Sequence, residues 1–206
     1  METLERLIEV GLAHFAIEGG AEAMPRLLSY TKELERWNRT INLVGLKKAE
    51  RIVADLLYDA FFLHTCVAAS ASLLDLGSGA GVASVPLAIL NPGMKVFSVD
   101  KSLKKTEFQR HIKRLLGLGG FEIIRGRIED VSPLHVEVLV AKAFGPTSSV
   151  LAKGGRHVAP GGTAFIVRGK DEGPSEHGGF LLEKVRPYSL PKSDKTYQLF
   201  IYKKVS

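Results

Sequence analysis

The chain has 206 residues, 45% of them hydrophobic and 24% charged, as in a globular protein with one sizeable core. Its single cysteine, Cys66, excludes an internal disulfide framework and a thiolate-rich metal site, and no apolar run reaches the about 18 residues that cross a bilayer. The net charge of +6 is uneven, since residues 1–60 carry 8 Lys and Arg against 10 Asp and Glu, whereas residues 61–206 carry 20 against 12. We expect a cytoplasmic protein without membrane or metal, whose second part favours a polyanionic partner.

The N-terminal part of the chain has the apolar spacing of helices. A three–four spacing predicts a first helix that ends at Gly19-Gly20 and a second that begins near Glu22. A third predicted helix covers residues 49–65, so we expect a helical extension over residues 1–66. We interpret Trp37 as a packing anchor between these helices and the sheet, the alternative being a stacking surface for a nucleic-acid base.

Residues 67–206 alternate short apolar strands with helical stretches. Five strands are predicted at residues 72–76, 95–99, 121–124, 136–140 and 163–167, with helices around 83–90 and 103–116. Strands separated by helices form right-handed βαβ units and a mostly parallel sheet. Residues 181–187 and 196–203 are expected to form an antiparallel pair at its edge. The prediction is an α/β domain with a seven-stranded sheet.

The turn after the first strand is rich in glycine and contains Asp75, Gly77, Ser78, Gly79 and Gly81. A strand–turn–helix context suits ligand binding, because glycine turns with positive φ and allows close approach. The dinucleotide-binding pattern requires a glycine where this chain has Val82. Three alternate glycines after an acid are typical of Rossmann-like methyltransferases, in which the turn passes beneath S-adenosylmethionine. The alternative is a tight turn without a ligand.

Two later loops complete the predicted cofactor site. Asp100 ends the second strand, 25 residues after Asp75, where a carboxylate can accept hydrogen bonds from both ribose hydroxyls. The alternative is that Asp100 caps the next helix. We include Lys101 beside it. In this architecture the loop after the third strand lies against the adenine, and it contains Arg127, Ile128 and Glu129.

A family resemblance joins these features to segments on either side of them. The segments are Trp37-Asn38-Arg39-Thr40-Ile41-Asn42-Leu43, Lys104/Lys105-x-x-Phe108, Arg127-Ile128-Glu129 and Lys142-Ala143-Phe144. From about residue 28 to the C-terminus, their order and spacing resemble the glucose-inhibited division protein B family. That family comprises the bacterial 16S ribosomal RNA 7-methylguanosine methyltransferases (small-subunit methyltransferase G).

The resemblance implies S-adenosylmethionine as cofactor and methyl transfer to N7 of a guanine in small-subunit ribosomal RNA or a 30S particle. It implies catalytic positions at Lys142 and Phe144, with Lys142 also at the cofactor. Guanine N7 carries an in-plane lone pair, so the reaction requires positioning rather than a general base. Phe144 then lies where methyltransferases place the target base, and both stacking on that base and simple packing remain open.

The chain departs from the family pattern mainly at expected substrate contacts. Val82-Ala83-Ser84 replaces Leu-Pro-Gly, and the Arg-His-x-x-Asp-Ser box reads Asp55-Leu56-Leu57-Tyr58-Asp59-Ala60, which keeps only the acid. Lys142 replaces an arginine and Arg168 replaces a late lysine. Lysine lacks the bidentate fork of arginine, so these positions leave the exact RNA target open.

Basic residues around the expected cofactor site form the predicted RNA surface, namely Lys47, Lys104, Lys105, Arg125 and Arg168. Loops at the carboxyl ends of parallel strands converge, and phosphate contacts from them give salt-dependent affinity. The alternative for the charged helix is a solvated face. Two other functions remain open: a methyltransferase of the same fold acting on a protein or small molecule, and a non-catalytic RNA-binding relative.

Overall fold

The computed structural model describes residues 3–169, 173–175, 177–193 and 196–205. Its N-terminal part consists of α1 (Leu4–His14), α2 (Gly20–Ile41), α3 (Ala49–Ile52), the π-helix η1 (Val53–Leu57) and α4 (Tyr58–Val67). Thr3 caps α1, because its hydroxyl accepts a hydrogen bond of 3.2 Å from the amide of Arg6. The prediction of one continuous helix over residues 49–65 is wrong in one respect. A π-helical segment interrupts it, and such segments change the direction of the side chains that follow.

Seven strands form one sheet in the order β3-β2-β1-β4-β5-β7-β6. They are β1 (Ser72–Leu76), β2 (Lys95–Asp100), β3 (Phe121–Arg125), β4 (Val136–Lys142), β5 (Val158–Gly169), β6 (Phe180–Ser189) and β7 (Thr196–Lys204). β1 to β5 pair in parallel, and β7 pairs antiparallel with both β5 and β6. This confirms the predicted sheet. β5 begins earlier than predicted, because Val158 pairs with Val136 ahead of a register shift.

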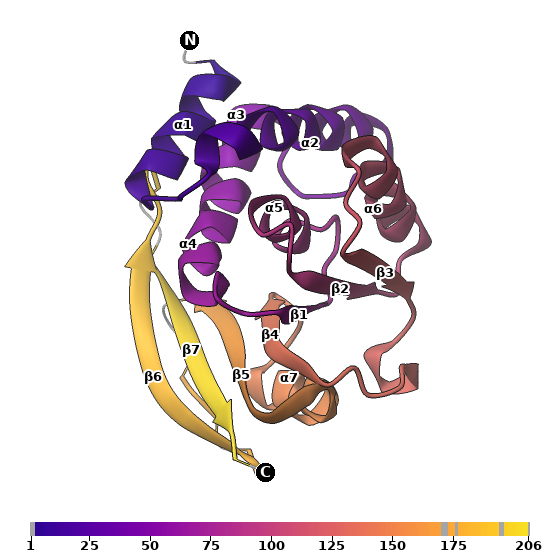
Figure 1. Ribbon diagram of the computed structural model, residues 1–206, viewed down its shortest axis with the longest axis vertical. Coiled ribbons are helices and arrows are strands. Elements are labelled where there is room, and N and C mark those ends of the chain that lie inside the picture. The colour runs from indigo at the N-terminus through magenta and orange to yellow at the C-terminus, as the bar shows by residue number, and fades with distance from the viewer. Residues whose placement is uncertain (1–2, 170–172, 176, 194–195, 206) are drawn as a thin grey trace.

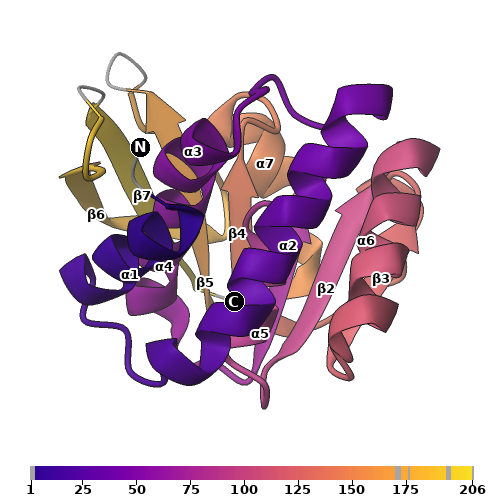
Figure 2. The same ribbon diagram turned by 90° about the horizontal axis from the view of Figure 1, so that it is seen from above.

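Helices lie on both faces of the sheet (Figures 1 and 2), and the two faces bury different clusters of side chains. In β1, Leu73 belongs to one cluster and Leu74 to the other, as the alternation of a strand requires. The N-terminal helices, α5 (Ser84–Leu90) and α6 (Leu103–Leu116) cover the first face. The second face carries α7 (Thr147–Gly154) with the 3-10 turns η2 (Ile128–Asp130) and η3 (Gly155–His157). The sequence patterns did not predict α7.

Trp37 joins the N-terminal helices to α6. Its ring packs edge-on against Phe108, with 5.5 Å between centroids, and stacks on His111 at 5.1 Å. At the start of α6, Lys104 Nζ donates a 3.0 Å hydrogen bond to the carbonyl of Ile41 at the end of α2. These contacts agree with the packing role of Trp37, which reaches the sheet through α6. Among the described helices, none has the length and apolarity to span a membrane.

Candidate active site

The glycine turn follows β1 directly, and its shape depends on residues without side chains. Gly77 and Gly79 have φ values of +71° and +59°, in the left-handed region that favours glycine. A Cβ at Gly77 would lie 2.5 Å from Cδ2 of Phe144, so this glycine also lets the Phe144 ring approach the backbone. A Cβ at Gly79 would meet only Lys105 Nζ, at 3.8 Å. The turn is therefore closely packed on the Phe144 side and open beside Gly79.

The side chain of Asp100 connects the end of β2 to this turn. Its Oδ2 accepts a 2.9 Å hydrogen bond from the amide of Gly79, and its Oδ1 accepts a 2.8 Å bond from the amide of Ser102. Asp100 thus holds Ser102, the residue that precedes α6, as well as the glycine turn, and its contact with a ribose stays a prediction. A carboxylate oxygen has two lone pairs, and each oxygen retains acceptor capacity for a ligand hydroxyl.

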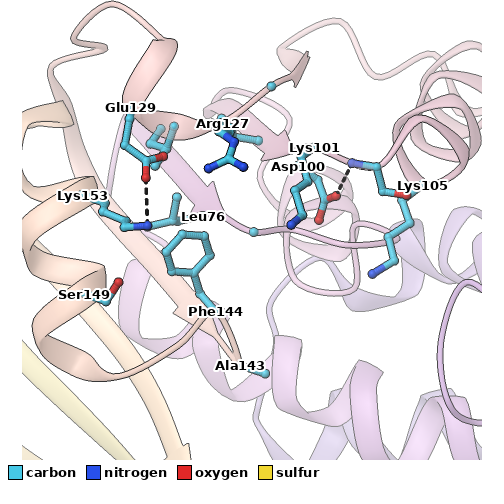
Figure 3. A pocket seen from close by; sticks show the side chains of 15 residues that line it. Leu76, Asp100, Lys101, Lys105, Arg127, Glu129, Ala143, Phe144, Ser149 and Lys153 are labelled. Atoms are coloured by element: carbon cyan, nitrogen blue, oxygen red, sulfur yellow. Dashed lines mark hydrogen bonds and ion pairs between the residues drawn. The ribbon is translucent and has the colours of Figure 1, made fainter.

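A cavity of about 470 Å³ opens at the carboxyl ends of β1 and β2, a volume in the range of small-molecule sites. Seven predicted cofactor or catalytic residues line it, namely Gly77, Asp100, Lys101, Arg127, Ile128, Glu129 and Phe144. Figure 3 shows Asp100 and Lys105 on one side of the cavity and Phe144 on the opposite side. Lys105, predicted as an RNA contact, therefore also lines the cavity, together with Ser149 and Lys153, which the sequence did not predict.

The loop after β3 is held in place from α7 and η3. Glu129 forms an ion pair of 2.8 Å with Lys153, and this hydrogen bond lowers the pKa of the Glu129 carboxyl (Figure 3). The guanidinium of Arg156 donates to the carbonyl of Glu129 at 2.9 Å and also to that of Val131. Ile128 is buried between these contacts. Lys153 lies on α7 and Arg156 in the 3-10 turn η3, two short elements with no strong sequence signal, which explains why both residues were missed.

Four predicted cofactor residues of β1 and the glycine turn do not line the cavity, namely Asp75, Ser78, Gly79 and Gly81. Asp75 is buried and accepts a 3.1 Å hydrogen bond from the amide of Ser84, and burial raises the pKa of its carboxyl to about 6. Ser78 accepts a 3.0 Å bond from Nε2 of the buried Gln109, which also donates to the carbonyl of Gly79 at 2.7 Å. Gly81 packs against α5 and Gln109, since a Cβ there would lie 2.7 Å from a methyl group of that helix.

Lys142 and Phe144 take different directions from the end of β4. Phe144 lines the cavity, whereas Lys142 does not; Lys142 Nζ instead lies 2.6 Å from Oδ2 of Asp59 on α4. Asp59 Oδ1 accepts a hydrogen bond from the hydroxyl of Tyr188 on β6. The predicted contact between Lys142 and a cofactor is therefore replaced in this structure by an ion pair with the N-terminal helices.

Four of the five predicted RNA contacts lie at the surface near the cavity or the N-terminal helices. Lys47, Lys104 and Arg125 are exposed and Lys105 is half-buried. Arg168 is buried, 5% exposed, and its Nε donates a 3.1 Å hydrogen bond to Thr147 Oγ1 beneath α7. The structure thus contradicts the predicted RNA contact at Arg168, because a guanidinium in this position does not reach a phosphate outside the protein. Within the described ranges, no group of three or more His, Cys, Asp or Glu side chains is arranged to hold a metal ion.

Solved structures of methyltransferases share this fold. TrmN from Thermus thermophilus has a TM-score of 0.56 and 18% identity over 72% of this chain and 48% of that chain. TYW2 of M. jannaschii, solved in complex with AdoMet, has a TM-score of 0.53 and 16% identity over 65% of this chain and 67% of that chain. At these identities the likeness concerns the fold, and it agrees with the predicted Rossmann-like class.

Sequence comparison identifies the family. The model described as rRNA small subunit methyltransferase G (GidB) matches residues 23–197. A Stenotrophomonas maltophilia protein named ribosomal RNA small subunit methyltransferase G is 34% identical over 188 residues, 89% of this chain and 87% of that protein. Its namesake in Bordetella avium is 30% identical over 196 residues, 91% of this chain and 88% of that protein. Because the family model covers well over half of the sequence, the chain belongs to the rRNA small subunit methyltransferase G family.

Proposed function

We propose that this protein transfers a methyl group from S-adenosylmethionine to N7 of a guanine in 16S ribosomal RNA. The observation that carries the proposal is the cavity in which Asp100 and the glycine turn face Phe144, in a chain of this family. The substrate is small-subunit ribosomal RNA, free or in a 30S particle, so we expect the protein to act in the cytoplasm. The assignment of guanine N7 as the methyl acceptor rests on the family resemblance alone.

The residues of the cavity fit S-adenosylmethionine part by part. Asp100 has acceptor capacity left for the ribose hydroxyls, and buried Ile128 offers an apolar surface to the adenine ring. Gly79 does not itself line the cavity, but a Cβ there would meet only Lys105 Nζ, which belongs to a residue that does, so we place the amino-acid part along this stretch of the turn. Arg156 and Lys153 keep the adenine loop in place. The bound cofactor supplies an electrophilic methyl group on a sulfonium, and its transfer breaks a C–S bond, forms a C–N bond and moves no proton.

The side chains at the cavity suit a reaction that depends on positioning. Both carboxylates that line it are engaged, Asp100 by two backbone amides and Glu129 by Lys153, so neither is presented as a general base. Phe144 offers an aromatic ring at the cavity wall, where it can stack on or pack beside a base. Lys104 and Arg125 carry exposed charge near the same edge, since Arg125 is the register partner of Asp100. These cations suit RNA phosphates.

Labelled methyl transfer tests this function directly. Labelled S-adenosylmethionine is offered to total bacterial RNA, isolated small subunits and total protein, with wild type, Asp100→Ala and Glu122→Ala. Glu122 is an exposed acid on β3 that forms an ion pair with Lys95 and does not line the cavity, and it serves as the matched control. We expect label in small-subunit RNA, cleavable at a 7-methylguanosine, that disappears with Asp100→Ala and persists with Glu122→Ala. Label in protein alone, or cofactor binding without RNA methylation, would contradict the proposal.

A further inference from the structure

A buried ion pair connects the N-terminal helices to the end of β4. Asp59 on α4 is 1% exposed, and its carboxylate contacts the Lys142 ammonium at 2.6 Å and the Tyr188 hydroxyl. Burial of a carboxylate is costly unless a counter-charge and hydrogen bonds compensate it. Asp59 therefore confines the Lys142 side chain to one place. Three elements far apart in the sequence, α4, β4 and β6, meet at this point.

Aromatic packing fixes the third member of this cluster. The Tyr188 ring stacks on Phe62 with 3.8 Å between centroids, and on Tyr197 at 5.4 Å. Burial raises the pKa of the Tyr188 hydroxyl well above its usual range, and nearby Asp59 raises it further, so the hydroxyl keeps its proton and donates to Asp59. Both carboxylate oxygens of Asp59 thus have a donor, Lys142 on β4 and Tyr188 on β6.

The residue after Lys142 is in a strained backbone conformation. Ala143 has a φ of +56°, in the left-handed region that non-glycine residues rarely adopt. Such a residue persists when its surroundings determine the backbone on both sides. On one side is the Asp59–Lys142 ion pair, and on the other is Phe144, whose ring packs against Gly77. Ala143 and Phe144 both line the cavity.

We propose that Asp59 is a positioning residue of the active site: through Lys142 it holds the strained turn at Ala143 and so fixes Phe144 at the cavity wall. The consequence for catalysis rests on the proposed methyl transfer, but the consequence for Phe144 does not. By this mechanism Asp59 of α4 contributes to the geometry of the site without touching either substrate.

The first test observes Phe144 itself. Phenylalanine labelled with ¹³C in the ring reports all ten phenylalanines, and Phe144→Leu assigns the signal of interest. We expect Asp59→Asn and Lys142→Met each to shift or broaden the Phe144 signal. Asp55→Asn is the matched control, because Asp55 is also a buried acid of this segment but pairs with Arg51, at 2.5 Å. An unchanged Phe144 signal in Asp59→Asn, at a temperature where the variant is folded, would overturn the proposal.

The second test uses the methylation rate with saturating S-adenosylmethionine in single-turnover reactions. We expect Asp59→Asn and Lys142→Met each to slow RNA methylation about tenfold, the double variant to be no slower than the slower single one, and the cofactor Kd to stay within about twofold. Multiplying losses in the double variant would show that the two residues act independently and would contradict the proposal. A wild-type protein that methylates no RNA would instead refute the proposed function, and the Phe144 signal would still decide the role of Asp59.

Discussion

The carboxylate of Asp100 accepts a hydrogen bond of 2.9 Å from the amide of Gly79, which lies 21 residues earlier in the chain. Through this bond the tip of β2 and the glycine turn form one rigid corner of the cavity. A change at Asp100 therefore alters both the proposed ribose acceptor and the turn proposed to lie under the rest of the cofactor, and both effects weaken cofactor binding.

Replacing Asp100 by asparagine should weaken binding of S-adenosylmethionine about tenfold to hundredfold. A hydrogen bond to a charged group contributes about 1.5–3 kcal/mol, and the amide offers only one acceptor oxygen. Isothermal titration calorimetry measures the change in Kd, with Glu122→Gln on β3 as the control. A Kd that stays at the wild-type value would remove Asp100 from the cofactor site.

Gly77→Ala should destabilise the protein more than Gly79→Ala. Both substitutions place alanine at a left-handed φ, which costs about 1–2 kcal/mol. Only at position 77 does the new Cβ collide with a ring, 2.5 Å from Phe144 Cδ2. Urea denaturation measures both free energies of unfolding, and equal losses would mean that the Phe144 ring moves away without cost.

Ionisation of Asp75 should lower the free energy of unfolding as the pH rises from about 4 to 6. Its carboxyl pKa is raised from 3.8 to about 6 by burial, so within this window the folded state binds the proton more tightly than the unfolded state. The stabilisation is fully present below the unfolded pKa and is lost as the pH passes the folded pKa, about 3 kcal/mol in all. Asp75→Asn keeps an oxygen for the Ser84 amide and should flatten this part of the stability curve. Parallel curves for wild type and variant would show that Asp75 titrates normally.

Charge reversal at Lys104 and Arg125 should weaken RNA binding and reduce its dependence on salt. Both side chains are exposed, and neither lines the cavity. Loss of two phosphate contacts lowers the slope of log K against log salt by about 1.4–1.8. Filter binding at several salt concentrations gives this slope, while cofactor affinity should remain unchanged. Lys184→Glu, an exposed lysine on β6, is the control. A slope equal to that of wild type would place the RNA elsewhere.

The elements that could be predicted are those whose signal is local. Apolar runs of β1 to β4 and the three–four spacing of α6 depend on burial against the nearest layer, and the structure has them within two residues of the predicted bounds. The glycine turn and Asp100 were also predictable from local signals. The end of an apolar run indicates a strand end, glycines indicate a backbone with positive φ, and the aspartate itself provides the carboxylate.

What could not be predicted depends on contacts between distant parts of the chain. α7 has only eight residues and little periodicity, so Lys153 and its pairing with Glu129 were missed. The π-helix and the capture of Lys142 by Asp59 are decided by the packing of α4 against β4 and β6. Arg168 carries a charge that favours the surface, yet β5 and α7 bury it. In each case a tertiary contact overrides the local preference.

The sheet order has a consequence for the time at which the fold is completed. β7 follows the other six strands in the chain, yet it lies between β5 and β6 in the sheet. β6 pairs with β7 from Phe180 to Ser189. A nascent chain that has not reached Thr196 therefore has no place for β6 to dock, and Tyr188 has not yet reached Asp59. The buried carboxylate of Asp59 on α4 therefore gains its hydrogen bond from Tyr188 only after β7 has formed and β6 has paired with it. Assembly of the β5-β7-β6 edge of the sheet is thus a late event of folding.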